Sequence, residues 1–231
     1  MMAKSLSVVI PAYRDASMIS EVVSSLLTVV KSEVGELEII IVEDGSPDNT
    51  AEVCRCLANK YPQVKIICHP KNMGYGRTLR DGFEAATKEF VFYTDGDNQY
   101  DLTQLPSALK LLEEVKVDAV LGYRYPRSDG IFRFLVSKVY NYLFRIVFPV
   151  YVRDVNCSFK LVKNNVMKML RLSSESAFID AEIVWGLKNK GFKFKEMPVS
   201  NFSNKFRRSN FVNPRRTLEI LNEMFRKKFC S

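Results

Sequence analysis

Three aspartates lie within seven residues in the segment FYTDGDNQYD, residues 92–101, which follows a run of aromatic and β-branched residues. In an extended segment the side chains of Asp95 and Asp97 project to the same side, about 6–7 Å apart along the backbone. Such carboxylates repel each other unless a cation binds them, and Mg²⁺ is usually held by one or two carboxylates plus substrate phosphates. The segment therefore predicts a Mg²⁺ or Mn²⁺ site that carries a diphosphate. A solvated acidic turn is the alternative.

The chain has a single histidine, His69. This excludes metal sites built from two or three histidines and argues against a Ser-His-Asp nucleophile. Acid–base chemistry must then rest on carboxylates, or the reaction must need no base.

Short apolar runs alternate along the chain with stretches in which apolar residues recur at helical spacing. The apolar runs predict strands at residues 5–13, 37–46, 64–70, 89–95 and 117–124. The helical stretches between them are residues 15–33, 46–61, 74–87 and 102–114. This alternation is typical of a parallel sheet that is covered by helices on both faces. We therefore expect an α/β fold with a mostly parallel, doubly wound sheet and amphipathic C-terminal helices.

Ligands of such sheets bind beyond the carboxyl ends of the strands. Polar side chains that could bind or react follow the predicted strands at these ends: Tyr13, Asp15, Asp44, Asp95, Asp97 and Arg124. The pattern predicts a single binding site along one edge of the sheet.

The length of 231 residues fits one domain, residues 1–231, with a ligand-binding half at 1–125 and a basic half at 126–231. The net charge is +8 and the pI is about 9.2, which favours phosphate-bearing partners. A nucleic-acid-binding domain would have no use for three clustered aspartates, so we expect no nucleic acid partner. Five cysteines without a C-x-x-C pair, and no secretory signal, favour a reducing cytoplasm.

Residues 131–152 form a strongly apolar segment that is interrupted by Arg133, Lys138, Asn141 and Arg145. These interruptions argue against a bilayer span. At helical spacing, apolar residues including Leu135, Val139 and Ile146 share one face, with Arg133, Ser137, Tyr140 and Asn141 mostly opposite. The pattern predicts either an interfacial membrane helix or an ordinary helix packed on the domain. The last helix, PRRTLEILNEMFRKKF, leaves the same choice open.

Seven motifs together resemble the inverting family 2 glycosyltransferases of GT-A fold, over about residues 5–210. The motifs are VVIPAYRD, IIIVEDGSPDNT, NMGYGRTLRDGF, YTDGDNQYD, LGYRY, RDVNCSFKLV and FIDAEIVWGLKNKGFKFKEMPV. The branch that they resemble most is the dolichyl-phosphate mannose synthase group, with its bacterial polyprenyl-phosphate sugar transferases.

The resemblance implies a donor site for a UDP- or GDP-linked sugar. The residues at the donor-nucleotide positions are Pro11, Tyr13, Asp15, Val42, Asp44, Arg77 and Asp95. Asp95, Asp97 and Gln99 match the metal site, and Asp97, Asp154 and Arg124 take the catalytic positions. Asp15 replaces the usual Glu of the family. Ser158 replaces the usual Gly, a residue that often marks a positive φ.

The resemblance also implies an acceptor that is a polyprenyl phosphate, either dolichyl or undecaprenyl. Arg124, Arg133, Ser137, Lys205 and Arg207 match the positions that hold the acceptor phosphate. This places the protein at the cytoplasmic membrane face, bound peripherally to an anionic surface, with a homo-oligomer or a separate membrane partner left open. The alternative is a glycan acceptor, for which Asp154 or Glu182 would act as the base. A nucleotidyltransferase fits less well, because IPAYRD lacks the Gly-rich basic start.

Overall fold

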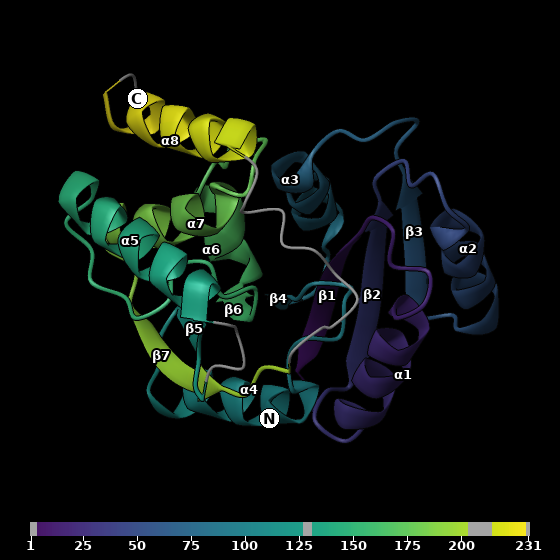
Figure 1. Ribbon diagram of the computed structural model, residues 1–231. Helices are drawn as coiled ribbons and strands as arrows, with labels where there is room; N and C mark the ends of the chain where they lie inside the picture. The colour runs from purple at the N-terminus through teal and green to yellow at the C-terminus, as the bar shows by residue number, and fades with distance from the viewer. Residues whose placement is uncertain (1–3, 127–130, 203–213, 230–231) are drawn as a thin grey trace.

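The computed structural model describes residues 4–126, 131–202 and 214–229. Within these ranges the chain forms one seven-stranded sheet in the order β3-β2-β1-β4-β6-β5-β7, with helices packed on both faces (Figure 1). The strands are β1 (Ser5–Ala12), β2 (Glu36–Glu43), β3 (Val64–Cys68), β4 (Phe90–Tyr93), β5 (Ala119–Arg124), β6 (Lys160–Lys163) and β7 (Phe194–Val199). The five strands predicted from the apolar runs are confirmed.

The sheet is mostly parallel. β1 pairs in parallel with β2 and β4, β2 with β3, and β5 with β7. Among the described strands only β6 runs in the opposite direction, and it is inserted between β4 and β5. The carboxyl ends of β1, β2, β4 and β5 therefore lie along one edge of the sheet.

Helices cover the two faces as two groups. α1 (Ile19–Val29), α2 (Thr50–Lys60) and α4 (Leu105–Glu114) share one hydrophobic core with the sheet. The other face packs against α3 (Tyr75–Ala85), α5 (Ile131–Val147), α6 (Asn164–Met169), α7 (Ile179–Asn189) and α8 (Pro214–Phe229). A short 3₁₀ helix, η1 (Leu102–Gln104), precedes α4.

Alternation along the strands explains why both faces are apolar. In β1, Val8 faces the first core and Val9 faces the second, and both are fully buried. Successive side chains of a strand point to opposite faces, so a strand that is covered on both faces must be apolar throughout. This is the pattern from which the sheet was predicted.

Candidate active site

The carboxyl ends of the central strands bring the predicted polar residues to one edge of the sheet. Tyr13 follows β1 directly, Asp44 follows β2, and Asp95 comes two residues after β4. Arg124 is the last residue of β5. These residues are distant in sequence, and the sheet topology places them along the same edge of the sheet.

Asp44 is held by the segment that leads into α3. Its carboxylate accepts hydrogen bonds from the backbone N–H groups of Met73 (2.7 Å) and Gly74 (3.0 Å) and contacts His69 Nδ1 at 2.8 Å. A carboxylate has about four acceptor positions, so one more donor, such as the N–H of a nucleotide base, can still be accommodated. Asp44 is 3% exposed, which makes it a rigid acceptor.

His69 links Asp44 to Arg77, a connection that motif reasoning missed. The other ring nitrogen of His69 contacts Asp81 Oδ2 at 3.0 Å, and Arg77 Nε donates to the same oxygen at 2.8 Å. Arg77, which was predicted to bind the donor nucleotide, thus lies at the end of a chain of contacts that begins at Asp44. The structure gives the single histidine a role in orienting carboxylates.

The end of β1 packs against the acidic motif. Asp15 Oδ2 accepts a hydrogen bond from the backbone N–H of Tyr13 at 2.9 Å. A Cβ at Gly96 would lie 3.2 Å from the Pro11 carbonyl oxygen and 3.3 Å from Asp15 Oδ2. The glycine between Asp95 and Asp97 therefore lets this motif approach the β1 end closely.

Asp95 is oriented by Tyr75, the first residue of α3. The Tyr75 hydroxyl donates to Asp95 Oδ1 at 2.9 Å and lies 3.2 Å from Ser158 Oγ. Burial, with the charges of Asp95 and Asp180, raises the pKa of Tyr75 well above its usual value, so the hydroxyl keeps its proton. Ser158 is not among the described residues with positive φ, so its replacement of glycine causes no strain here.

Asp97 is buried and lies beside Gln99. The Gln99 amide nitrogen donates to Asp97 Oδ2 at 2.9 Å, which supports the carboxylate. Within the described ranges, no group of three or more His, Cys, Asp or Glu side chains is arranged to hold a metal ion. A pair of carboxylates still fits Mg²⁺ or Mn²⁺, because such ions take their remaining ligands from diphosphate and water.

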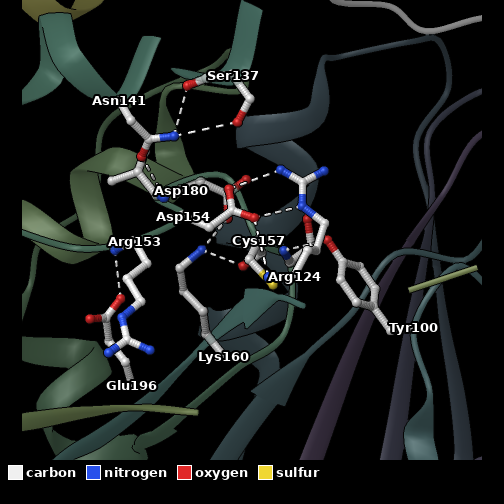
Figure 2. Close-up of polar contacts among 12 residues, drawn as sticks. Tyr100, Arg124, Ser137, Asn141, Arg153, Asp154, Cys157, Lys160, Asp180 and Glu196 are labelled. Atoms are coloured by element: carbon white, nitrogen blue, oxygen red, sulfur yellow. Dashed lines mark hydrogen bonds and ion pairs between the residues drawn. The ribbon is translucent and has the colours of Figure 1, made fainter. Parts of the chain in front are cut away.

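Arg124 and Asp154 form a bidentate ion pair, with Nε–Oδ2 at 2.6 Å and Nη2–Oδ1 at 2.9 Å (Figure 2). The exposed fractions of the two side chains are 16% and 4%. Burial lowers the pKa of Arg124, but the hydrogen bond and charge of Asp154, together with the nearby Tyr100 and Cys157, outweigh burial and raise it, so the guanidinium stays charged. The structure thus brings together the two residues for which separate catalytic roles were predicted.

A second buried ion pair lies close to the first and was not predicted. Lys160 is fully buried, and its Nζ donates to Asp180 Oδ1 at 2.7 Å and to the Cys157 carbonyl at 2.6 Å (Figure 2). Tyr93 donates to the same oxygen of Asp180 at 2.5 Å. The signal in the sequence was Lys160 itself, which lies six residues after Asp154 in the motif RDVNCSFKLV.

Helix α5 packs on the domain with the side that carries Asn141 and leaves part of its apolar face exposed. Asn141, Phe144 and Phe148 are buried, whereas Val139 is 59% exposed and Ile146 64% exposed. The sequence left open whether this helix lies in a membrane interface or packs on the domain, and in the structure its side with Asn141 packs on the domain. Ser137 lies on this helix, and residue 133 belongs to its first turn.

The remaining acceptor-side residues, Lys205 and Arg207, lie outside the described residues. The described chain before them ends at Phe202, whose N–H donates to the Gln99 carbonyl at 2.7 Å. The segment that follows β7 is thus fastened next to the acidic motif.

Glu182 has a structural environment. Its carboxylate accepts hydrogen bonds from Ser173 and Ser174 and pairs with Lys227 of α8 at 2.6 Å. Burial raises the pKa of Glu182, but the hydrogen bonds of Lys227 and Ser174 outweigh burial and lower it. A carboxylate so enclosed and so stable as an anion is a poor general base.

Solved structures with this arrangement of strands define the class of fold. Glucosyl-3-phosphoglycerate synthase from Mycobacterium tuberculosis superposes with a TM-score of 0.72 at 15% identity, covering 97% of this chain and 80% of that one. The same enzyme has been solved with Mn²⁺, UDP-glucose and phosphoglyceric acid. The chain therefore has a GT-A glycosyltransferase fold, as expected from the sequence.

The family model "Glycosyl transferase family 2" matches residues 7–171, and the chain belongs to this family. Glycosyltransferase AglD of Haloferax volcanii is 29% identical over 206 residues, covering 84% of this chain and 32% of AglD. Dodecaprenyl-phosphate galacturonate synthase of Rhizobium johnstonii is 28% identical over 172 residues, covering 74% of this chain and 51% of the synthase. The chain thus spans about a third to a half of these relatives. Within the described residues, no helix is long and apolar enough to cross a membrane.

Proposed function

We propose that this glycosyltransferase moves a sugar from a UDP- or GDP-linked donor to a polyprenyl phosphate, with inversion at the anomeric carbon. The observation that carries the proposal is the buried bidentate pair of Arg124 and Asp154. Asp154 is one of the two residues that could serve as a base for a hydroxyl acceptor, and both its carboxylate oxygens are bonded to Arg124.

A phosphate acceptor removes the need for a base, since it attacks as an anion. The other candidate base, Glu182, is 1% exposed and bonded to Ser173, Ser174 and Lys227. With both candidates occupied, an acceptor that carries no proton to be removed fits the site better than a sugar hydroxyl. The relative named dodecaprenyl-phosphate galacturonate synthase supports the same choice.

The donor half follows from the carboxylates at the sheet edge. Asp44 would accept the N–H of the base, a donor group that uracil and guanine both carry. Asp95 and Asp97 would hold a Mg²⁺ or Mn²⁺ ion through which the donor diphosphate is bound, with Gln99 keeping Asp97 in place. When bound, the ion neutralises charge on the departing nucleoside diphosphate.

The transfer then needs alignment more than proton movement. The bond from the anomeric carbon to the diphosphate oxygen breaks, and a bond from that carbon to an acceptor phosphate oxygen forms on the opposite side. Arg124, kept charged by Asp154, would orient the acceptor phosphate together with Arg133 and Ser137. Lys205 and Arg207 would add positive charge from the segment that begins beside Gln99.

Helix α5 would bring the protein to the lipid. Its exposed apolar side chains form a stripe at helical spacing: Leu135, Val139, Tyr142 and Ile146. Lys138 lies on the same helix and is exposed as well, so apolar and cationic groups face solvent together. This combination is typical of helices that lie in the interface of an anionic membrane, which supports peripheral attachment at the cytoplasmic face.

A donor and acceptor screen tests the proposal. Radiolabelled UDP- and GDP-sugars would be incubated with undecaprenyl or dolichyl phosphate, detergent and Mn²⁺ or Mg²⁺, and label would be counted after organic extraction. We expect label in the organic phase that is lost with EDTA. Hydrolysis or transfer of one nucleotide sugar without any lipid product would move the acceptor to a glycan or another hydroxyl compound.

A further inference from the structure

Asn141 is a buried polar residue on the inward face of α5, with an exposed fraction of 4%. Its Oδ1 accepts a hydrogen bond from the backbone N–H of Val155 at 3.0 Å. Its Nδ2 donates to the Ser137 carbonyl at 2.8 Å and lies 3.4 Å from Ser137 Oγ (Figure 2). Asn141 therefore links its own helix α5, which also bears Ser137, to Val155, the residue that follows Asp154.

The loop from Asp154 to Ser158 is held by side chains from several other elements. The Tyr100 hydroxyl accepts the N–H of Ser158 at 3.0 Å, and Lys160 donates to the Cys157 carbonyl at 2.6 Å. Tyr100 follows the acidic motif directly, and Lys160 begins β6. Each contact holds a different backbone group, so several elements together fix the conformation of the loop that carries Asp154.

Helix α5 supplies a second contact on the other side of Asp154. Arg145 Nη2 donates to the carbonyl of Val152 at 2.9 Å. Asn141 and Arg145 are four residues apart, so they lie on neighbouring turns of one helix side. The helix thus holds the loop at Val152 and at Val155, with Asp154 between them.

We infer that Asn141 is a positioning residue for the transfer reaction. It fixes the loop that holds Asp154 against Arg124 to the helix that carries the acceptor-side residues, so that acceptor phosphate and reaction centre keep one relative placement. The inference rests on the proposed function for the identity of the acceptor. Asn141 itself contacts neither donor nor acceptor in this account.

Filling space alone does not explain an asparagine at this position. Burying an amide is unfavourable unless its hydrogen bonds are made, and an apolar residue would fill the same space at lower desolvation cost. Leucine, however, could not accept the hydrogen bond that the N–H of Val155 donates to Asn141. Displacing groups by about 1 Å can cost 100-fold in rate, so a directional bond between helix and loop has a catalytic use.

Asn164 offers a matched control. It is 6% exposed, begins α6, and donates to the carbonyls of Ala86 (3.1 Å) and Lys88 (2.7 Å). These carbonyls precede β4, at the amino end of the strand, whereas the site lies beyond the carboxyl ends. Asn164→Leu therefore removes a similar set of bonds away from the site.

The test compares Asn141→Leu, and Asn141→Ala should leucine prevent folding, with Asn164→Leu. For the Asn141 variants we expect at least tenfold faster amide exchange in residues 152–160. We also expect at least a tenfold loss of kcat/KM for the acceptor, with the donor KM within twofold of the wild-type value. For Asn164→Leu we expect both the exchange in this segment and the acceptor kcat/KM to stay within twofold.

Unchanged exchange or unchanged acceptor kcat/KM in the Asn141 variants would overturn the inference. Equal losses in the Asn141 and Asn164 variants would overturn it too, since they would indicate general destabilisation. The exchange measurement needs no acceptor. It therefore tests whether Asn141 couples α5 to the loop of residues 154–158 even if the wild-type protein makes no lipid product. That result would contradict the proposed function alone.

Discussion

Replacing Val139 and Ile146 by serine should detach the protein from anionic vesicles without destabilising its fold. The two side chains are 59% and 64% exposed, so the folded protein itself gains little from them. Burying a whole aliphatic side chain stabilises by about 1.5–3 kcal/mol, so the exposed part of each is worth about 1–2 kcal/mol at a membrane. The double variant should then lose about 2–4 kcal/mol of binding, or about 30- to 700-fold in partition coefficient.

Val115 provides the control for this substitution. It is also exposed, at 42%, but it follows α4 on the opposite face of the sheet from α5. Binding would be measured by co-sedimentation with vesicles that contain phosphatidylglycerol, and stability by thermal unfolding. Val115→Ser should bind as the wild-type protein does. Equal binding by the α5 double variant, or an equal loss in Val115→Ser, would refute the assignment of α5 as the membrane-facing element.

Three further predictions concern the metal site, the acceptor site and acid stability. Asp97→Asn should lower metal-dependent transfer at least about 100-fold with little change in the melting temperature, and full activity in EDTA would contradict the site assignment. Arg133→Ala should raise the acceptor KM about 10- to 100-fold, the worth of a charge-assisted hydrogen bond, and leave the donor KM unchanged. Burial raises the pKa of Glu38, but hydrogen bonds from Lys65, Ser7 and Thr87 outweigh it and lower the pKa from 4.5 to about 2. The stability that Glu38 contributes is therefore present above pH 4.5 and lost as the pH falls towards 2, and unfolding titrations of Glu38→Gln should lack this part of the acid dependence.

The parallel sheet could be predicted because its strands are buried on both faces. A run such as Ile39 to Val42 is apolar throughout because helices cover both sides of the sheet, and this pattern is local in sequence. β6 was not predicted, because it lacks a long apolar run of this kind. It is four residues long, and Lys160 and Lys163 stand at its ends. Its place in the sheet depends on pairing with β4 and β5, which no local pattern encodes.

The full burial of Lys160 could not be predicted either. A lysine is almost never buried unless it is paired, and its partner Asp180 comes twenty residues later on another element. The link from Asp44 through His69 to Asp81 is likewise a tertiary contact between segments that follow different strands. Residue types and strand ends predicted which edge of the sheet would gather these polar residues, whereas the bonds that orient the carboxylates needed the structure.

Helix α5 shows why amphipathicity alone did not decide between two roles. The periodicity correctly indicated an apolar face, but hydrophobicity would ordinarily turn that face inward. In the structure the inward face is the one whose Asn141 bonds to Val155 and whose Phe144 and Phe148 are buried. Both sides of the helix therefore carry apolar side chains, and the stripe of Leu135, Val139, Tyr142 and Ile146 stays exposed in the structure.

A comparison of two acceptors that differ only in the phosphate tests the central claim most directly. Undecaprenyl phosphate and undecaprenol would be offered at equal concentration, each with the labelled nucleotide sugar that the wild-type protein uses and with Mn²⁺. We expect a labelled lipid product from the phosphate alone, because Arg124 would orient an anionic nucleophile and both candidate bases, Asp154 and Glu182, are already paired with cations. Transfer to undecaprenol at a comparable rate would contradict it, since a base would then have to act at this site.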